Sequence, residues 1–388
     1  MRVKDQNFLK IKNQSIVLEY IIKNGPISRA EIAKHMEMSP TSASRIVASL
    51  HEEQLIKEVY LHTDDIGRKA TYFMANEDSV ISVGVEIDVG VIRIGFMNLI
   101  GELISEHSFP FNTDSYERVA DFIGQTVNEL IDREAITNDR VIGICIGLPG
   151  LIDNKEGIVE LSAQFNWKLA SLKKILEEKL DYKLFIDNEL KLKALAEYLR
   201  TSMDYKNIAM IGFGNGVGSA LISDGQIYRG KDNMSGEIGH MTLDPYGVYC
   251  PCGNFGCLQT YIATDFLLNE ASKTRPMKHM NELVQAYNEG ENWAVNIIDK
   301  ATTYAVLAIN NVVCAYNPDA VFLSGSLIED YPEIREIIIK KHSNSNFFPQ
   351  SRSYELHVTE LEGNGVIKGA ALSVLRRFIK NLHVKGDV

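Results

Sequence analysis

The sequence predicts an α/β protein in two parts, a small amino-terminal unit of helices and a larger body of alternating strands and helices. Helix-capping signals divide the first 60 residues into short helices, and from Ile81 onward short apolar strands alternate with helices. The charge divides in nearly the same place. The 388 residues carry −11, but residues 1–75 carry +2 and the rest −13. With 45% hydrophobic and 23% charged residues, the composition excludes disordered and collagen-like chains.

Three short helices are predicted at the amino terminus. Residues 14–25 have apolar residues at helical spacing and end at Gly25-Pro26. Ser28 and Glu31 form a capping box for a second helix that ends near Glu37-Met38. Ser39 caps a third helix with Pro40 at its first position. The inward face of this third helix consists of Ala43, Ile46, Val47 and Leu50.

A predicted hairpin follows the three helices. Residues 55–75 form two strands around a turn at residues 64–67. Three helices followed by a hairpin are typical of a winged helix-turn-helix, whose recognition helix lies in the major groove of double-stranded DNA. Small polar side chains let that helix approach closely, Arg45 reaches a base edge or phosphate, and the hairpin tip enters the minor groove. The expected DNA-binding residues are Ser39, Pro40, Thr41, Ser42, Ser44, Arg45, Gly67, Arg68 and Lys69. The alternative is a solvated three-helix appendage that binds a protein partner.

The body contains two similar series of elements. The first consists of three strands over residues 81–109, a helix over 114–132, a strand over 141–150, a helix over 168–180, a strand over 183–188 and a helix over 189–200. The second has a strand over 207–222, a hairpin at Asp224-Gly225, a largely helical stretch after Thr264, and strands at 320–325 and 354–361. Two such halves predict a two-lobed ribonuclease-H-like body of the actin type, with a cleft between the lobes. We place the domain boundary between residues 77 and 78, so that 1–77 and 78–388 are separate domains.

A cluster of metal-ligating residues lies in the second half. His240, Cys250, Cys252 and Cys257 fall within 18 residues. One imidazole and three thiolates suit one structural zinc ion per chain, with no position left for water. Gly253 and Gly256 let the loop fold tightly. Buried free thiols are the alternative, and an odd total of five cysteines disfavours a disulfide framework.

Two polar segments are candidates for ligand binding. Glu237 precedes His240 by three residues, where a carboxylate would hold polyol hydroxyls. Asp187, Asn188 and Glu189 follow an apolar strand, and acidic residues at strand ends commonly line an α/β cleft. The alternatives are a surface glutamate in the first case and helix-capping residues in the second. The glycines at 212, 214, 216 and 218 indicate either a phosphate-binding loop or a tight turn.

These motifs together resemble the ROK family of repressors, open reading frames and sugar kinases. The most specific match is the family pattern G-E-x-G-H followed by C-x-C-G-x-x-G-C, which appears here as GEIGH…CPCGNFGC. The amino-terminal unit is similar to that of the repressor branch, which includes xylose and N-acetylglucosamine repressors. The resemblance implies a sugar-kinase-like body, with a small carbohydrate effector contacted by Asn166, Asn188, Glu189, Glu237, His240 and Gln259.

The kinase motifs of that family are altered here. The family D-x-G-x-T phosphate loop corresponds to residues 86–90, with Asp88 in place of the glycine and Gly90 in place of the threonine. The catalytic aspartate corresponds to Glu189, and a G-G pair reads Ser324-Gly325. An added carboxylate repels phosphate, so we expect no catalytic residues and no kinase activity. The alternatives are an active ATP-dependent sugar kinase with a DNA-binding head, an activator, or a repressor controlled by a partner protein.

The resulting prediction is a sugar-responsive repressor that binds operator DNA as a homodimer or homotetramer. No segment reaches the roughly 20 apolar residues of a membrane span, and the first residues lack a signal-peptide pattern. We therefore expect a cytoplasmic protein that does not bind membranes.

Overall fold

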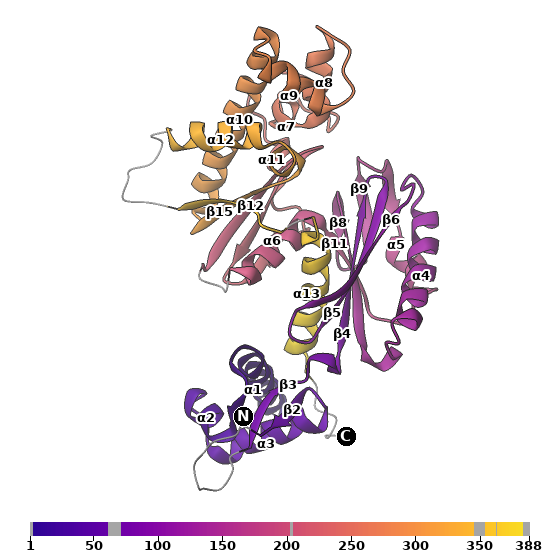
Figure 1. The fold of residues 1–388 in the computed structure, drawn as a ribbon, viewed down its shortest axis with the longest axis vertical. Helices are drawn as coiled ribbons and strands as arrows, with labels where there is room; N and C mark the ends of the chain where they lie inside the picture. Colours follow the sequence, from indigo (N-terminus) through magenta and orange to yellow (C-terminus); the bar gives the residue numbers. More distant parts are fainter. Residues whose placement is uncertain (1–2, 61–70, 202–204, 345–353, 362, 383–388) are drawn as a thin grey trace.

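The computed structural model describes residues 3–60, 71–201, 205–344, 354–361 and 363–382, and for residues 3–12 the backbone alone. It has three parts: a head at the bottom of Figure 1, lobe I at the right and lobe II above at the left. The head ends with the strand at Tyr72–Ala75, and the short helix η1 (Glu77–Ser79) connects it to lobe I.

The head combines three helices with a small sheet. Its elements are α1 (Val3–Asn24), β1 (Ile27–Ser28), α2 (Arg29–His35), α3 (Pro40–Glu52), β2 (Ile56–Val59) and β3 (Tyr72–Ala75). The strands are antiparallel in the order β1-β3-β2. The predicted caps are confirmed: the Ser28 and Glu31 side chains form the capping box, and the Ser39 hydroxyl accepts from the Ser42 N–H at 3.1 Å.

Two details of the head differ from the prediction. Helix α1 begins at Val3 instead of residue 14, because residues 3–13 contain no Gly or Pro that would stop it. The two-residue strand β1 was not predicted, since it is too short to show an alternating pattern. Residues 61–70, which include the predicted contacts Gly67, Arg68 and Lys69, lie outside the described residues.

Lobe I is built on a five-stranded sheet in the order β11-β7-β4-β5-β6. Its elements are β4 (Ile81–Asp88), β5 (Val91–Asn98), β6 (Leu103–Pro110), α4 (Tyr116–Arg133), η2 (Asn138–Arg140), β7 (Val141–Leu148), β8 (Leu151–Asp153), β9 (Ile158–Ser162), β10 (Trp167–Ala170), α5 (Leu172–Glu177) and β11 (Leu184–Asn188). The prediction of a helix over 168–180 is wrong at its start, because Trp167–Ala170 pairs with β9 as a strand. The small sheet β8–β10 was not predicted.

Lobe II repeats this topology. Its strands are β12 (Asn207–Phe213), β13 (Val217–Ser223), β14 (Gln226–Tyr228), β15 (Ala320–Ser324) and β16 (Glu355–Val358). The order β14-β13-β12-β15-β16 places the third, second, first, fourth and fifth strands side by side, as in lobe I. In both lobes the first three strands are antiparallel and the last two join in parallel. The predicted two related halves are confirmed, although residues 207–222 form two strands instead of one.

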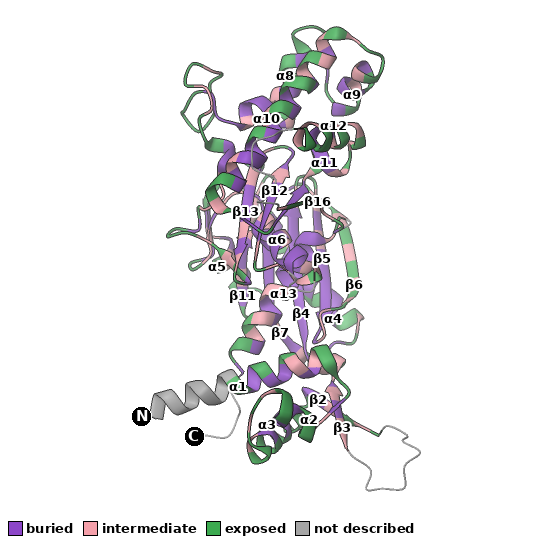
Figure 2. Cartoon of the chain, turned by 90° about the vertical axis from the view of Figure 1, so that its left-hand side faces the viewer, coloured by how far each residue is buried: buried purple, intermediate pink, exposed green. Residues whose placement is uncertain are grey.

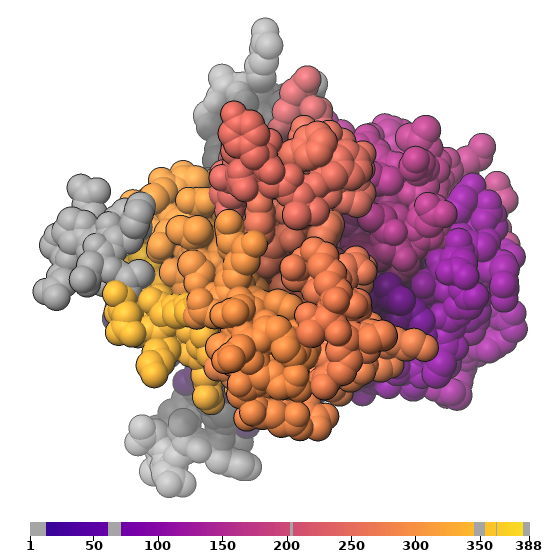
Figure 3. Space-filling model, turned by 90° about the horizontal axis from the view of Figure 1, so that it is seen from above, coloured from indigo at the N-terminus to yellow at the C-terminus, as the bar shows by residue number. Residues whose placement is uncertain are grey.

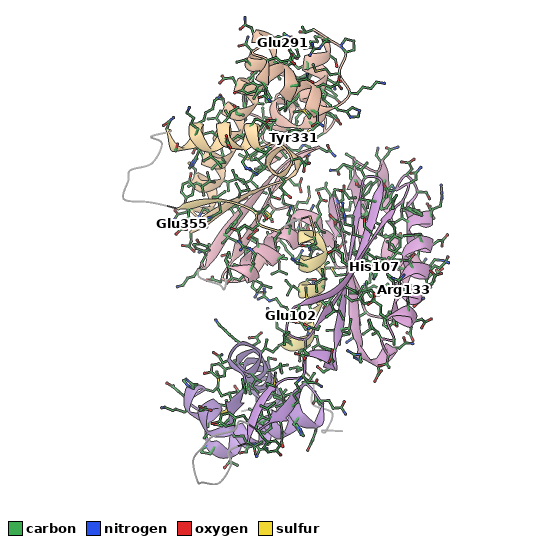
Figure 4. All side chains as sticks on the ribbon, in the orientation of Figure 1. Glu102, His107, Arg133, Glu291, Tyr331 and Glu355 are labelled. Carbon is green, nitrogen blue, oxygen red and sulfur yellow. The ribbon has the colours of Figure 1, made fainter. Side chains whose placement is uncertain are left out.

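The helices of lobe II cover the far face of its sheet. They are α7 (Gln259–Ile262), α8 (Thr264–Ser272), α9 (Met280–Asn288), α10 (Asn292–Tyr316), α11 (Ser326–Glu329) and α12 (Pro332–Ser343). Figure 2 shows that the central strands of both lobes are buried, and Figure 4 shows His107 and Arg133 next to each other in lobe I. No helix in the described ranges combines the length and apolar character needed to cross a bilayer.

Helices α6 (Glu189–Arg200) and α13 (Gly365–Lys380) pack together between the two sheets. A Cβ atom on Gly369 would lie 1.9 Å from the carbonyl oxygen of Leu192, so only glycine permits this approach. Figure 1 shows α13 running from between the lobes toward the head. The last turns of α13 complete the core of the head.

The shared core contains residues from both ends of the chain. Leu375 and Ile379 of α13 belong to the same buried cluster as Val17 and Ile21 of α1. The Ser15 hydroxyl donates to the carbonyl oxygen of Ile379 at 2.5 Å. The head is therefore packed on the body by apolar contacts and does not have a core of its own residues alone.

We expect Ile379→Ala to lower the free energy of unfolding by about 2–4 kcal/mol, because a buried isoleucine would leave a cavity in the shared core. Ile339→Ala on α12, where the side chain is 39% exposed, is the matched control, and we expect a loss below about 1 kcal/mol. Urea unfolding measures both. Equal losses for the two variants would contradict a shared core.

Candidate functional site

The four predicted metal ligands come together. Ligand atoms of His240, Cys250, Cys252 and Cys257 all lie within 4.8 Å of one another. The sulfur atoms of Cys252 and Cys257 are 3.6 Å apart, and Nδ1 of His240 is 3.9 Å from the sulfur of Cys250. Tetrahedral zinc with bonds of about 2.3 Å to sulfur separates its ligand atoms by about 3.8 Å. The donor set and its spacing therefore fit a zinc ion.

The loop that carries these ligands is held by backbone pairing. Isolated bridges join Thr242 to Cys257 and Tyr249 to Phe255. Gly253 and Gly256 have positive φ angles of 97° and 61°, which confirms the predicted tight turns. The Gln259 amide, at the start of α7, donates to the sulfur of Cys250 at 3.2 Å. This loop directly follows η3 (Ile238–His240), so the segment carrying Glu237 is continuous with the metal cluster.

A buried polar network connects the two lobes. Arg229, after β14, forms a salt bridge through both of its terminal nitrogens with Asp187 at the end of β11. Asn233, also from lobe II, donates to the carbonyl oxygen of Ile152 in lobe I at 2.9 Å. Lys191 of α6 is 2% exposed and donates to the backbone and side-chain oxygens of Asn233. We call Asp187, Lys191, Arg229 and Asn233 the interlobe network.

Glu237 lies beside this network. Burial raises the pKa of Glu237, and the charge of Lys191 opposes that shift. Burial lowers the pKa of Lys191, against the charges of Asp187 and Glu237. The two groups are thus close enough for their charges to interact, which places Glu237 next to the interlobe network. Figure 3 shows from above that the lobes stand side by side and that the surface is hollowed between them.

The other predicted effector contacts lie in different settings. Asn188 caps α6: its side chain accepts from the Lys191 N–H at 3.2 Å and donates to the carbonyl oxygen of Gly150 at 3.1 Å, so the helix-capping interpretation is confirmed. Asn166 is exposed on the turn between β9 and β10 with a φ of 57°. Trp167 beside it is buried and its indole donates to the carbonyl oxygen of Asp114 at 3.2 Å. No interaction described for these residues joins Asn166 to Glu237.

Three carboxylates meet where α6 begins. Burial, followed by the charges of Asp88 and Glu86, raises the pKa of Glu189 to about 8. Burial also raises the pKa of Glu86, although Arg93 donates to its carboxylate at 2.9 Å. Asp88 accepts from the Val89 N–H at 2.7 Å. We call Glu86, Asp88 and Glu189 the carboxylate cluster, and Glu189 is largely protonated in it at pH 7.

A fourth carboxylate, that of Glu329 on α11, accepts hydrogen bonds from three donors. Oε1 of Glu329 accepts from the Lys193 ammonium at 2.6 Å, the Ser324 hydroxyl at 2.8 Å and the Gly325 N–H at 2.8 Å. Although burial opposes it, Lys193 lowers the pKa of Glu329, as do the other two donors. The N–H of Val89, in the segment matched to a kinase phosphate loop, and the N–H of Gly325, in the segment matched to the adenosine-side glycine pair, are therefore both bonded to carboxylates of the same chain.

The predicted recognition helix presents the expected face. Ala43, Ile46, Val47 and Leu50 are buried. The exposed residues are Ser39, Pro40, Thr41, Ser44 and Arg45, while Ser42 is half-buried. Sequence reasoning missed Arg229 and Asn233, for which the sequence holds no local signal, and Glu329, which lies outside any recognised motif.

Comparisons with known proteins agree on the architecture. Residues 82–376 match the ROK family and residues 11–60 match the MarR family. The chain is 29% identical over 381 residues to a xylose repressor of Bacillus spizizenii, covering 98% of this chain and 99% of that one. It is 26% identical over 339 residues to the DNA-binding transcriptional dual regulator NagC of Escherichia coli, covering 84% of each.

Two solved structures extend the comparison. A ROK family transcriptional regulator, described as a homolog of the E. coli MLC protein, superposes with a TM-score of 0.79 at 25% identity, covering 96% of this chain and 97% of that one. A ROK hexokinase from Thermus thermophilus gives a TM-score of 0.67 at 25% identity, covering 76% of this chain and 97% of that one.

We expect Glu189→Gln to stabilise the protein at alkaline pH. Between the ordinary pKa of 4.5 and about 8, the folded state binds a proton at Glu189 that the unfolded state has lost, so stability falls as the pH rises. Glutamine removes this loss and should add about 2 kcal/mol or more at pH 8.5 and nothing at pH 4. Thermal unfolding across pH measures it. The exposed Glu160→Gln is the control and should leave the pH profile unchanged; a parallel shift at all pH values for Glu189→Gln would contradict the buried, protonated carboxyl.

Proposed function

Because the chain belongs to the ROK family, we propose that it represses transcription of sugar-metabolism genes and that a carbohydrate in the cleft between its lobes controls its affinity for operator DNA. The observation that carries this proposal is the union of a winged helix-turn-helix head with a ROK body, matched over 98% of the chain in a xylose repressor. We assign DNA binding to residues 1–77 and effector binding to residues 78–388, in a cytoplasmic protein.

The head would bind DNA through α3. Its exposed face offers Thr41, Ser44 and Arg45. The short side chains of Thr41 and Ser44 let the helix approach the bases, while the guanidinium of Arg45 reaches farther. Two heads of a homodimer or homotetramer would occupy half-sites related by symmetry. The excess of acid in the body disfavours loose electrostatic binding, so contacts of the head decide where the protein binds.

The effector would bind against Glu237, His240, Asn188, Glu189, Asn166 and Gln259. Glu237 supports this assignment best, because it is a half-buried carboxylate beside the interlobe network and so faces groups from both lobes. A carboxylate accepts strong hydrogen bonds from hydroxyls, and a protonated Glu189 donates one. A sugar held between the lobes would favour one arrangement of them over another.

Helix α13 would carry that change to the head. Arg376 of α13 is close enough to Glu19 of α1 for the charge of the glutamate to act on it. Lys380 donates to Gln226 of lobe II at 2.9 Å. A movement of lobe II relative to lobe I therefore acts on the helix that completes the core of the head. Ligand and DNA are coupled only to the extent that each binds the two arrangements with different affinity.

We assign the His/Cys cluster to a structural zinc ion. The zinc ion would hold in place the loop that continues from Glu237, and it would thereby also hold the wall of the cleft to which we assign Glu237. We expect no phosphoryl transfer, because Asp88 and Glu329 occupy the N–H groups of Val89 and Gly325. Coupled ATP turnover against a panel of pentoses and hexoses tests this, and measurable turnover would favour a sugar kinase with a DNA-binding head.

The direct test is an electrophoretic shift on the DNA upstream of the gene, with and without sugars. We expect sequence-specific, salt-sensitive binding that a carbohydrate alters. Binding that ignores DNA sequence, or that no carbohydrate changes, would contradict the proposal.

We expect Arg45→Ala to weaken operator binding about tenfold or more, because a base or phosphate contact of the recognition helix is worth about 1–3 kcal/mol. Arg118→Ala, which removes the same charge from the exposed face of α4, should leave binding within about twofold. A shift titration measures both. An equal loss for the two variants would point to net charge instead of a specific contact.

We expect Cys252→Ser to release the metal and abolish the response to the effector, because three ligands no longer close a tetrahedral site. Elemental analysis and operator binding with sugar measure the two effects. Cys314→Ser, on α10 and outside the cluster, is the control and should retain both. A full sugar response in the metal-free variant would separate the metal from the effector site.

A further inference from the structure

The cations around the cleft are already engaged by groups of the same chain. The positive groups whose charges act on Glu86, Glu189 and Glu237 are Arg93, Lys193 and Lys191. Arg93 pairs with Glu86 at 2.9 Å, and Lys193 pairs with Glu329 at 2.6 Å.

The third of these cations, Lys191, belongs to the interlobe network together with Arg229. Lys191 is buried against Asn233, and Arg229 is held by Asp187. Among the described groups named for this cleft, every cation therefore has a partner within the chain.

The carboxylates of the cleft, in contrast, are in excess. Asp88, Glu189 and Glu237 have no counter-ion within salt-bridge distance among the described residues. Burial, followed by the charges of Asp88 and Glu86, raises the pKa of Glu189 to about 8. The cleft thus offers several hydrogen-bond acceptors and one protonated donor, Glu189. The cations named for it are already bonded to other groups of the chain.

Glu329 occupies three hydrogen-bond donors that could otherwise bind an anion. Its single oxygen Oε1 collects an ammonium, a hydroxyl and a backbone N–H at the start of α11. These three donors are of the kinds that bind phosphate in proteins. The carboxylate takes the place that an external anion would otherwise occupy.

We propose that the cleft selects an uncharged polyol and rejects phosphorylated sugars, and that Glu329 is a specificity-determining residue because it keeps Lys193 and Gly325 from a phosphate. The proposal rests on the proposed function, whose effector class it narrows. A phosphate monoester carries about −1.5 to −2 charges at pH 7 and needs free cations or N–H donors. Hydroxyls need only the acceptors and the donor that the cleft already offers.

The first experiment compares candidate ligands by isothermal titration calorimetry on the full native chain. The probes are xylose, glucose, N-acetylglucosamine, the 6-phosphates of the last two, and inorganic phosphate. We expect one of the uncharged sugars to bind at least about tenfold more tightly than any phosphate ester. Tighter binding of a 6-phosphate than of its parent sugar would overturn the inference and leave a carbohydrate-controlled repressor standing.

The second experiment frees Lys193. We expect Glu329→Gln to gain at least about tenfold in affinity for inorganic phosphate, because the lysine and the Gly325 N–H lose their internal anion. Glu336→Gln, the same change at an exposed position of α12, should gain nothing. The double variant Lys193→Met with Glu329→Gln should also gain nothing, because no cation is freed.

These variants decide the inference even if no sugar in the panel binds. A phosphate gain confined to Glu329→Gln supports it, whereas no gain, or an equal gain in Glu336→Gln, overturns it. Operator binding by each variant confirms that it is folded. If the native protein does not bind operator DNA, the proposed repressor function is contradicted, but the role of Glu329 is not.

Discussion

The packing of α13 against both the body and the head is the constraint on which the rest of the structure depends. The helix begins between the two sheets, where a glycine lets it approach α6 to within backbone contact, and ends in the core of the head. A close-packed helix of this kind does not bend or slide gradually, because neighbouring side chains resist small shifts. Displacements at the cleft and at the head are therefore connected through one rigid element.

The cleft has two chemically different halves. On the side of the metal loop, Glu237 and the interlobe network offer hydrogen-bonding groups from both lobes. In the segments around β4 and α11, Asp88 and Glu329 accept from the N–H groups of Val89 and Gly325. The fold superposes on that of a ROK hexokinase with a TM-score of 0.67, and in this chain carboxylates of its own accept from both of these backbone N–H groups.

Features encoded by neighbouring residues were predictable from the sequence. The His/Cys spacing, the Ser28 and Ser39 caps and the inward face of α3 each lie within one short segment, and the structure confirms all of them. The repeated series of strands and helices was also predicted from the alternation of elements, whereas the strand order within each sheet was not. Strand β10 was mistaken for helix because only its pairing with β9, a tertiary contact, makes it extended.

Long-range pairs in the candidate site could not be predicted in the same way. Arg229 and Asp187 are 42 residues apart, and Lys193 and Glu329 are 136 apart. No periodicity or motif relates such partners, because the fold alone brings them together. The shared core of the head was missed for the same reason, since its last members come from the far end of the chain.

That shared core has a consequence for how the protein matures. The ribosome makes the helices of the head before it makes α13, so Leu375 and Ile379, which complete their core, are added long after α1. A nascent chain therefore exposes the apolar side of α1 until α13 has emerged and docked. Competence to bind DNA arises only together with a finished effector body, so an interrupted translation product is a candidate for proteolysis and not an unregulated repressor.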